Sequence, residues 1–470
     1  MMKIIYSIIG VFSLAISLSS CATQTQGELR KRRTDDLEHI GNASREIFLK
    51  HDMQSFPTQC DYMKNYLVNI KHPSQPLYLC ERASFNLLMG KNAEAGDDLR
   101  NAIDMLEMFF DKEKEKQAVS VWGNESDKVY KGEPFERAIL YMLYGLCLLE
   151  DKEQVDNALA CFKRALLMDG DTEKNEYQSD FGLVFLLAAK CYDLLGEKDE
   201  RNYMLNQAAK CYLTQYSPDG KINLQLRLKM ELEQSLKARK ITPLVHDILT
   251  WGGTSIGNDF DFIPIEDRQW LEETFSEEPV LDFNTIVIIW NGRGPWFTRD
   301  GNNDSARMIN LIPKMHLGKQ PFVFEMAQEN GQISSFIDIL GDVNYQAITR
   351  GGRLMDKVQQ GKSNTKDTTR DYGDFLMSEA FVCIPYVGLA TTIIGGGLKE
   401  ASQHMHVEAD TRSWQCLPAE FTVGLMKLSP GNNSVELRTK IAGKEKVLQR
   451  QNHTIVYDPS MPVNVVHLFP

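Results

Sequence analysis

The chain has 470 residues, of which 43% are apolar and 25% are charged. This ordinary globular composition excludes whole-chain disorder and collagen-like structure, and at about 150 residues per domain the length predicts two or three domains. The 52 Lys and Arg residues against 64 Asp and Glu residues give a net charge of −12. A chain this acidic has no general affinity for polyphosphate, so nucleic acid is not expected as a partner.

The N-terminus has the pattern of an export signal. Lys3 precedes an uncharged apolar run from Ile4 to Leu18, which is shorter than the roughly 20 residues of a membrane-spanning helix and suits the core of a signal peptide. The run ends in Leu18-Ser19-Ser20-Cys21. This sequence resembles the bacterial lipobox, whose cysteine receives lipid before the signal is cleaved. The alternative is a plain signal peptide with a cysteine there by accident.

A lipobox implies a lipid-anchored protein of the bacterial cell envelope. Residues 1–20 are then the signal peptide, and Cys21 is the first mature residue, carrying acyl chains such as palmitate. Two or more chains give stable membrane anchoring. Residues 21–34 are predicted to be a polar tether, and Ala22, which is not Asp, favours the outer membrane facing the periplasm.

Residues 35–236 are predicted to form a helical domain, because apolar residues recur there at spacings of three and four. Small residues within it follow the spacing of the tetratricopeptide repeat, where they lie at helix crossings and turns. They are Ala83, Gly90, Ala95 and Ala102 in a first copy, Gly145, Ala158 and Ala165 in a second, and Ala189, Gly196 and Ala208 in a third. Such an array either binds a protein or peptide on its concave surface or only supports the rest of the molecule.

Residues 237–470 are predicted to form a β-rich domain, so the fold class is α+β with a tetratricopeptide-like array before a sandwich-like module. Candidate strands are Thr285–Trp290, Pro321–Met326, Ile333–Leu340, Glu420–Leu428, Ser434–Ile441, Glu445–Arg450 and Val463–Phe469. The connector Ser429–Asn433 is typical of a hairpin turn. The uncharged, glycine-rich segment 380–398 is either a buried helix pair or hairpin or a membrane span.

Two short motifs mark the β-rich part. Asn291-Gly292-Arg293-Gly294-Pro295 follows a candidate strand, and Ala409-Asp410-Thr411-Arg412-Ser413-Trp414 precedes Leu417-Pro418. With the lipobox and the helical half, these motifs resemble a family of uncharacterised bacterial lipoproteins, whose pattern includes an Asn-Gly-x-x-Pro turn and this Trp-containing segment. Arg293 and Trp296 flank the turn, so its chemistry can differ from the family pattern. The resemblance implies no enzymatic role, and it suggests an association with cell-wall synthesis machinery.

The segment around Asp410, Arg412 and Trp414 has two interpretations. In the structural one, Asp410 and Arg412 form a hydrogen-bonded pair that fixes the entry to the terminal sheet, and Trp414 is buried against it. In the functional one, Arg412 binds a carboxylate of a ligand or partner. An Asp-Thr-Arg-Ser run before a strand favours the structural interpretation.

Two common enzymatic motifs are missing from the sequence: it contains no P-loop and no HExxH pattern. We predict no cofactor and no metal site, because His404, His406 and the carboxylates after them fit a solvated strand face. The eight cysteines after Cys21 are expected to be mostly buried thiols, with a Cys60–Cys80 bridge as an alternative.

The sequence therefore favours a non-enzymatic envelope lipoprotein that acts as a scaffold for an unknown protein or peptide. The alternatives are a lipoprotein factor in peptidoglycan synthesis or cell-wall maintenance, a hydrolase with an unrecognised carboxylate site, and a surface adhesin or assembly subunit.

Overall fold

The chain divides into two compact units in the computed structural model, Met1–Gln59 and Cys60–Pro470. The described residues are 42–69, 74–116, 129–170, 180–214, 226–252, 265–274, 281–300, 306–310, 316–317, 320–349, 411–441, 444 and 446–470. The predictions for the signal peptide (1–20), Cys21 and the tether (21–34), segment 380–398, the two histidines and Asp410 lie outside these residues.

The first unit contains a helix over residues 42–49, the short helix η1 (Met53–Ser55) and the start of α2 (Phe56–Asn69). Phe48 and Phe56 are buried. Gln59 donates a hydrogen bond from Nε2 to the Ser44 hydroxyl over 2.9 Å, so a buried polar contact ties α2 to the helix before it.

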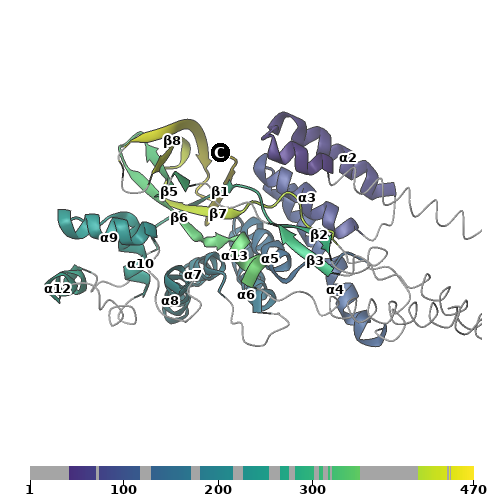
Figure 1. Ribbon diagram of the computed structural model, residues 1–470, viewed down its shortest axis with the longest axis horizontal. Coiled ribbons are helices and arrows are strands. Elements are labelled where there is room, and N and C mark those ends of the chain that lie inside the picture. The colour runs from purple at the N-terminus through teal and green to yellow at the C-terminus, as the bar shows by residue number, and fades with distance from the viewer. Residues whose placement is uncertain are drawn as a thin grey trace, which may run out of the picture. The chain divides into compact units, whose positions relative to one another are not determined.

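The N-terminal half of the second unit consists of successive helix pairs (Figure 1). They are α3 (Gln75–Leu88) with α4 (Asn92–Lys116), α5 (Pro134–Leu148) with α6 (Val155–Gly170), and α7 (Gly182–Leu195) with α8 (Lys198–Thr214). Helix α5 begins with a proline, which suits the first position of a helix. The Glu136 side chain accepts the Glu133 N–H over 2.7 Å, as in a capping box.

Small residues lie where these helices pack closely. The alanines singled out in the sequence are fully buried, namely Ala83, Ala95, Ala102, Ala158, Ala165, Ala189 and Ala208. At Gly145 in α5, a Cβ atom would lie 2.6 Å from Cε1 of Phe162 in α6. Gly90 and Gly196 end α3 and α7 with φ angles of 72° and 80°, which glycine adopts without strain.

Helical structure continues beyond residue 237, the position at which the β-rich domain was predicted to begin. Helices α9 (Leu226–Ala238), α10 (Pro243–Gly252) and α12 (Ile265–Thr274) precede the first strand, which begins at Thr285. Helix α10 buries Leu244, Val245, Ile248 and Leu249, and this spacing is that of one helix face. The helices from α3 onward and the strands belong to the same compact unit.

The main sheet has eight strands in the order β10-β1-β7-β6-β5-β8-β9, with β4 beside β5. Strands β1 and β10 are parallel, and the other neighbours are antiparallel. A separate ribbon pairs β2 (Trp296–Asp300) with β3 (Ala306–Asn310). The strands of the main sheet are β1 (Thr285–Asn291), β4 (His316–Leu317), β5 (Gln320–Gln328), β6 (Ile333–Asp342), β7 (Glu420–Met426), β8 (Gly431–Ile441), β9 (Val447–Tyr457) and β10 (Asn464–Leu468).

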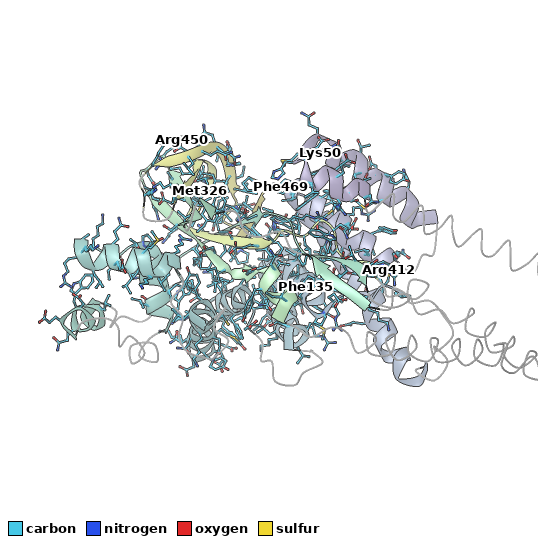
Figure 2. The ribbon with its side chains drawn as sticks, viewed as in Figure 1. Lys50, Phe135, Met326, Arg412, Arg450 and Phe469 are labelled. Atoms are coloured by element: carbon cyan, nitrogen blue, oxygen red, sulfur yellow. The ribbon has the colours of Figure 1, made fainter. Side chains whose placement is uncertain are left out.

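The sheet is curled around a hydrophobic core on one of its faces. Val466 and Leu468 of β10 pack against this core, which comes mainly from the other strands and consists of Val287, Ile289, Phe324, Met326, Phe336, Met426, Leu428, Val435, Leu437 and Ile455. Met326 is buried inside the curl, whereas Arg450 lies on its exposed outer side (Figure 2). The ring of Phe336 fits over Gly424, where a Cβ atom would approach it to 2.7 Å.

The opposite face of the central strands packs against the helices. Trp290 is fully buried and donates from Nε1 to Nδ1 of His467 over 2.9 Å. Burial lowers the pKa of His467 to about 3, so the imidazole is neutral. At Gly182 in α7, a Cβ atom would lie 2.5 Å from a methyl carbon of Leu340 in β6. Close packing therefore joins the helical layer to the sheet.

Two sequence expectations for the β-rich part differ from the structure. All the main strands form one curled sheet, so the arrangement of two stacked sheets is not confirmed. The connector Ser429–Asn433 joins β7 to β8, which are not neighbours, so it is not a hairpin. The side chain of Asn433 holds this turn by donating to the carbonyls of Ser429 and Gly431 over 2.8 and 2.9 Å, and such local bonds stabilise turns regardless of strand pairing.

The described helices include none with the length and apolar character needed to cross a membrane. The cysteines in the described residues are free thiols: Cys60, Cys80, Cys147, Cys161, Cys191, Cys211 and Cys416. The alternative of a Cys60–Cys80 bridge is therefore not realised.

The close contact at Gly145 predicts an unusual effect of alanine. Gly-to-Ala in a helix interior normally stabilises a protein by about 1 kcal/mol, but the added methyl group would collide with the buried Phe162 ring. We expect Gly145→Ala to lower the free energy of unfolding by about 1 to 3 kcal/mol, the usual cost of overpacking, in urea titrations. Adding Phe162→Leu should recover part of this loss, and a stabilised single variant would contradict the packing described here.

Candidate functional site

The two motifs singled out in the sequence meet in the structure. Gly294 donates its N–H to the carbonyl oxygen of Leu417 over 2.8 Å, and a Cβ atom at Gly294 would lie 2.8 Å from that oxygen. Gly292 has a φ of 70°, with Ala419 against it, and Pro295 is buried. The turn after β1 therefore needs glycine at both positions to pack against the segment before β7.

Asn291 ends β1 in a row of polar residues that crosses three strands. It pairs with Glu420 of β7, which in turn pairs with Asp342 of β6. Burial raises the pKa of Asp342 well above its usual range, and the nearby Glu420 charge raises it further. Asp342 caps the following helix, α13 (Val343–Thr349), by accepting the Tyr345 N–H over 3.0 Å.

Glu420 also stabilises a bulge in β6. Its carboxylate accepts the N–H of Ile339, which lies where the β6–β7 register shifts and has a φ of 70°. This backbone conformation is strained for a β-branched residue. The polar row therefore supports an irregular strand conformation.

Arg293 lies over the indole of Trp296, with the guanidinium carbon 3.6 Å from the ring centroid. Arg293 is buried, and a cation over an aromatic face gains electrostatic attraction. These two residues, which flank the turn, thus contact each other.

Residues Thr411–Ala419, called here the docking segment, pack against helices α3 and α5. Trp414 is 2% exposed. Its indole Nε1 donates to the Ser84 hydroxyl in α3 over 3.0 Å, and its backbone N–H donates to Glu136 in α5 over 2.6 Å. Gln415 donates its backbone N–H to Glu81 over 3.3 Å. Side chains of the helices thus satisfy the backbone of a segment that lacks regular secondary structure.

Glu136 is the most connected of these carboxylates. Besides Trp414 N–H, it accepts the Tyr130 hydroxyl over 2.7 Å and the Glu133 N–H over 2.7 Å. Burial, with a smaller effect of the Glu133 charge, raises the pKa of Glu136 to about 7, although all three hydrogen bonds oppose this change. The structure thus keeps a carboxyl group that titrates near neutral pH between the docking segment and α5.

Arg412 lies at the start of the docking segment (Figure 2). Its Nη1 donates to the Ser74 hydroxyl over 3.0 Å, and its guanidinium carbon is 5.9 Å from the Tyr130 ring centroid. The expected pair with Asp410 involves a residue outside the described ones. Arg412 therefore contacts the helical layer of its own chain.

The carboxylates of this region do not form an accessible reaction centre in the described structure. Glu81, Glu136, Asp342 and Glu420 are each no more than 3% exposed. A general acid or base must come within hydrogen-bond reach of its substrate, and these groups instead accept N–H groups of the chain. Their chemistry supports the fold.

Within the described ranges, no group of three or more His, Cys, Asp or Glu side chains is arranged to hold a metal ion. The predicted row beginning at His404 and His406 lies outside those ranges.

A buried ion-pair network beside the β6 bulge was not predicted from the sequence. Arg227 of α9 is 2% exposed and contacts Asp338 through Nη1 and Glu231 through Nε, both over 3.0 Å. Its Nη1 also donates to the backbone carbonyl of Phe336 over 2.5 Å. Glu231 lies four residues after Arg227, a spacing that indicates a helical ion pair, but no sequence pattern connects either residue to Asp338.

The titration of Glu136 predicts a pH effect on stability. Its pKa of about 7 in the folded chain exceeds the ordinary value of 4.5, so its contribution to stability is fully present below pH 4.5 and is lost as the pH rises through 7. We expect Glu136→Gln to flatten the fall in the free energy of unfolding between about pH 5 and pH 7, by up to about 1 kcal/mol per pH unit. The glutamine oxygen can still accept Trp414 N–H.

Chemical denaturation across this pH range measures the effect. Glu153→Gln, at an exposed position, is the matched control and should leave the pH profile unchanged. Parallel profiles for the parent chain and Glu136→Gln would contradict the assignment.

The sequence matches no known protein-family model and no curated protein.

Proposed function

We propose that this chain is a non-enzymatic, lipid-anchored scaffold of the bacterial cell envelope that binds a protein or peptide partner. The observation that carries the scaffold proposal is the series of helix pairs from α3 to α8, with small residues where helices pack closely. We interpret these pairs as tetratricopeptide-like, and arrays of this kind commonly bind proteins. The curled sheet encloses its core much as a sandwich does.

The helices differ in how much of their surface the rest of the chain covers. The first helices of the pairs, α3, α5 and α7, are buried along most of their length, and the docking segment and the sheet lie against them. Exposed side chains are found on the second helices, including Leu167 of α6 at 59% and Tyr203 of α8 at 59%. We therefore place the partner on the second helices rather than on a concave surface lined by the first.

The location depends on the lipobox-like Leu18-Ser19-Ser20-Cys21. The same chain features, with the resemblance to uncharacterised lipoproteins, favour a second candidate: a factor in peptidoglycan synthesis or cell-wall maintenance. This candidate predicts a wall-synthesis enzyme as the partner and wall defects on deletion, whereas a general scaffold does not.

Lipidation predicts a clear effect of changing Cys21. We expect the parent chain to incorporate labelled palmitate and to fractionate with membranes. Cys21→Ala should abolish labelling and leave the signal uncleaved at this position, because the modified cysteine is the processing site. Intact-mass measurement checks both points. A parent chain with an unmodified N-terminus that is secreted freely would contradict the anchoring.

Partner binding is tested by cross-linking and pull-down from detergent-solubilised envelopes. Leu167→Asp and Tyr203→Asp place charges on the proposed surface, and we expect recovery of a specific partner to fall about tenfold or more, because burying a charge costs more than the apolar contact it replaces. Ile333→Asp, at a 45% exposed position on β6, is the matched control. Recovery that is unaffected by either helix variant would remove the proposed surface.

A further inference from the structure

The two edge strands of the curled sheet, β10 and β9, differ in how their outer backbone groups are covered. At β10, the N–H of Val465 donates to Glu150 over 3.1 Å, and its carbonyl accepts from Asn92 Nδ2 over 3.0 Å. Asn92 also donates to Glu150 over 2.9 Å. Helix-end side chains thus occupy backbone groups that an edge strand would expose. Strand β9 forms the other end of the described sheet.

Strand β9 has few of the features that protect an edge. It pairs with β8 without a register shift from Gln449 to Tyr457, and it contains no proline. Its outward side chains are Leu448, Arg450, Asn452, Thr454 and Val456, because alternate residues share a face and Ile455 faces the core. Leu448 is 44% and Val456 is 61% exposed. Proteins usually protect such edges with charges, prolines or bulges.

The outward face of β9 is complementary to a second copy of β9 that runs antiparallel to it. When the two copies are aligned with Asn452 opposite Asn452, Leu448 lies opposite Val456, and Arg450 lies opposite Thr454. Directly opposed side chains on antiparallel strands interact, and like charges there are unfavourable. This arrangement pairs apolar with apolar at both ends and brings no two like charges opposite each other.

We propose that β9 pairs with β9 of a second copy of this chain, antiparallel and with the two-fold axis at Asn452, so that two curled sheets become continuous. Such an interface uses the same surface of both copies and closes as a dimer. Val456 already accepts a hydrogen bond from Asn464 Nδ2 over 3.1 Å. A carbonyl oxygen has two lone pairs, so this contact is compatible with the added strand and marks its end.

Cysteine cross-linking of the full-length chain in detergent tests this register. Asn452 lies on the axis, so Asn452→Cys brings the two new thiols together, since opposed Cβ atoms are about 5 Å apart. We expect a dimer-mass band under oxidation that a reductant removes. Thr454→Cys faces Arg450 of the second copy and should not cross-link, and neither should Ile333→Cys or the unsubstituted chain.

Light scattering with size-exclusion chromatography gives an independent measurement. Leu448→Lys and Val456→Lys should each weaken dimerisation by about tenfold or more, because each variant removes an aliphatic side chain from both copies. Both positions are exposed in the single chain, so folding should be unaffected, and circular dichroism checks this. A monomeric parent chain, a dimer that resists both lysines, or cross-linking of Asn452→Cys only to another protein or within one chain would overturn the proposal.

Discussion

The structure depends on how it satisfies the backbone of the docking segment, which is buried without belonging to a helix or strand. A buried N–H without a partner costs about 1 to 3 kcal/mol. Glu81 and Glu136 accept the N–H groups of Gln415 and Trp414, so two helices supply what a neighbouring strand would otherwise provide. The same segment leads into β7, a central strand. Loss of these contacts would therefore loosen the join between the helices and the sheet.

Much of this architecture could be predicted from local pattern. The run Thr285–Trp290 is β-branched and apolar, and it forms a buried strand; the alanines at helical spacing are buried at packed positions. Strand order could not be predicted, because it depends on contacts between distant residues. Ser429–Asn433 has the composition of a hairpin turn, yet it joins strands separated by β6 and β5. Turn composition determines local backbone conformation and not which strands pair.

The candidate site shows the same limit. The glycine turn and the Trp-containing segment were recognisable as motifs, and they contact each other through Gly294 and Leu417. Neither motif indicated Glu136, which lies 278 residues from Trp414 in sequence. A glutamate near a helix start is ordinarily a cap or a solvated charge. Only the fold shows that it also binds another part of the chain.

The buried carboxylates further constrain what the molecule can do. Glu81 and Glu136 face the docking segment, and Asp342 and Glu420 support the bulge and helix beside it. Replacing any of them with an apolar side chain would remove a hydrogen bond to a backbone N–H group. These hydrogen bonds offset the cost of desolvating the carboxylates. Helices α3 and α5 therefore bind the segment that leads into the sheet. The partner surface that we propose on the second helices and the interface that we propose at β9 both lie outside this core.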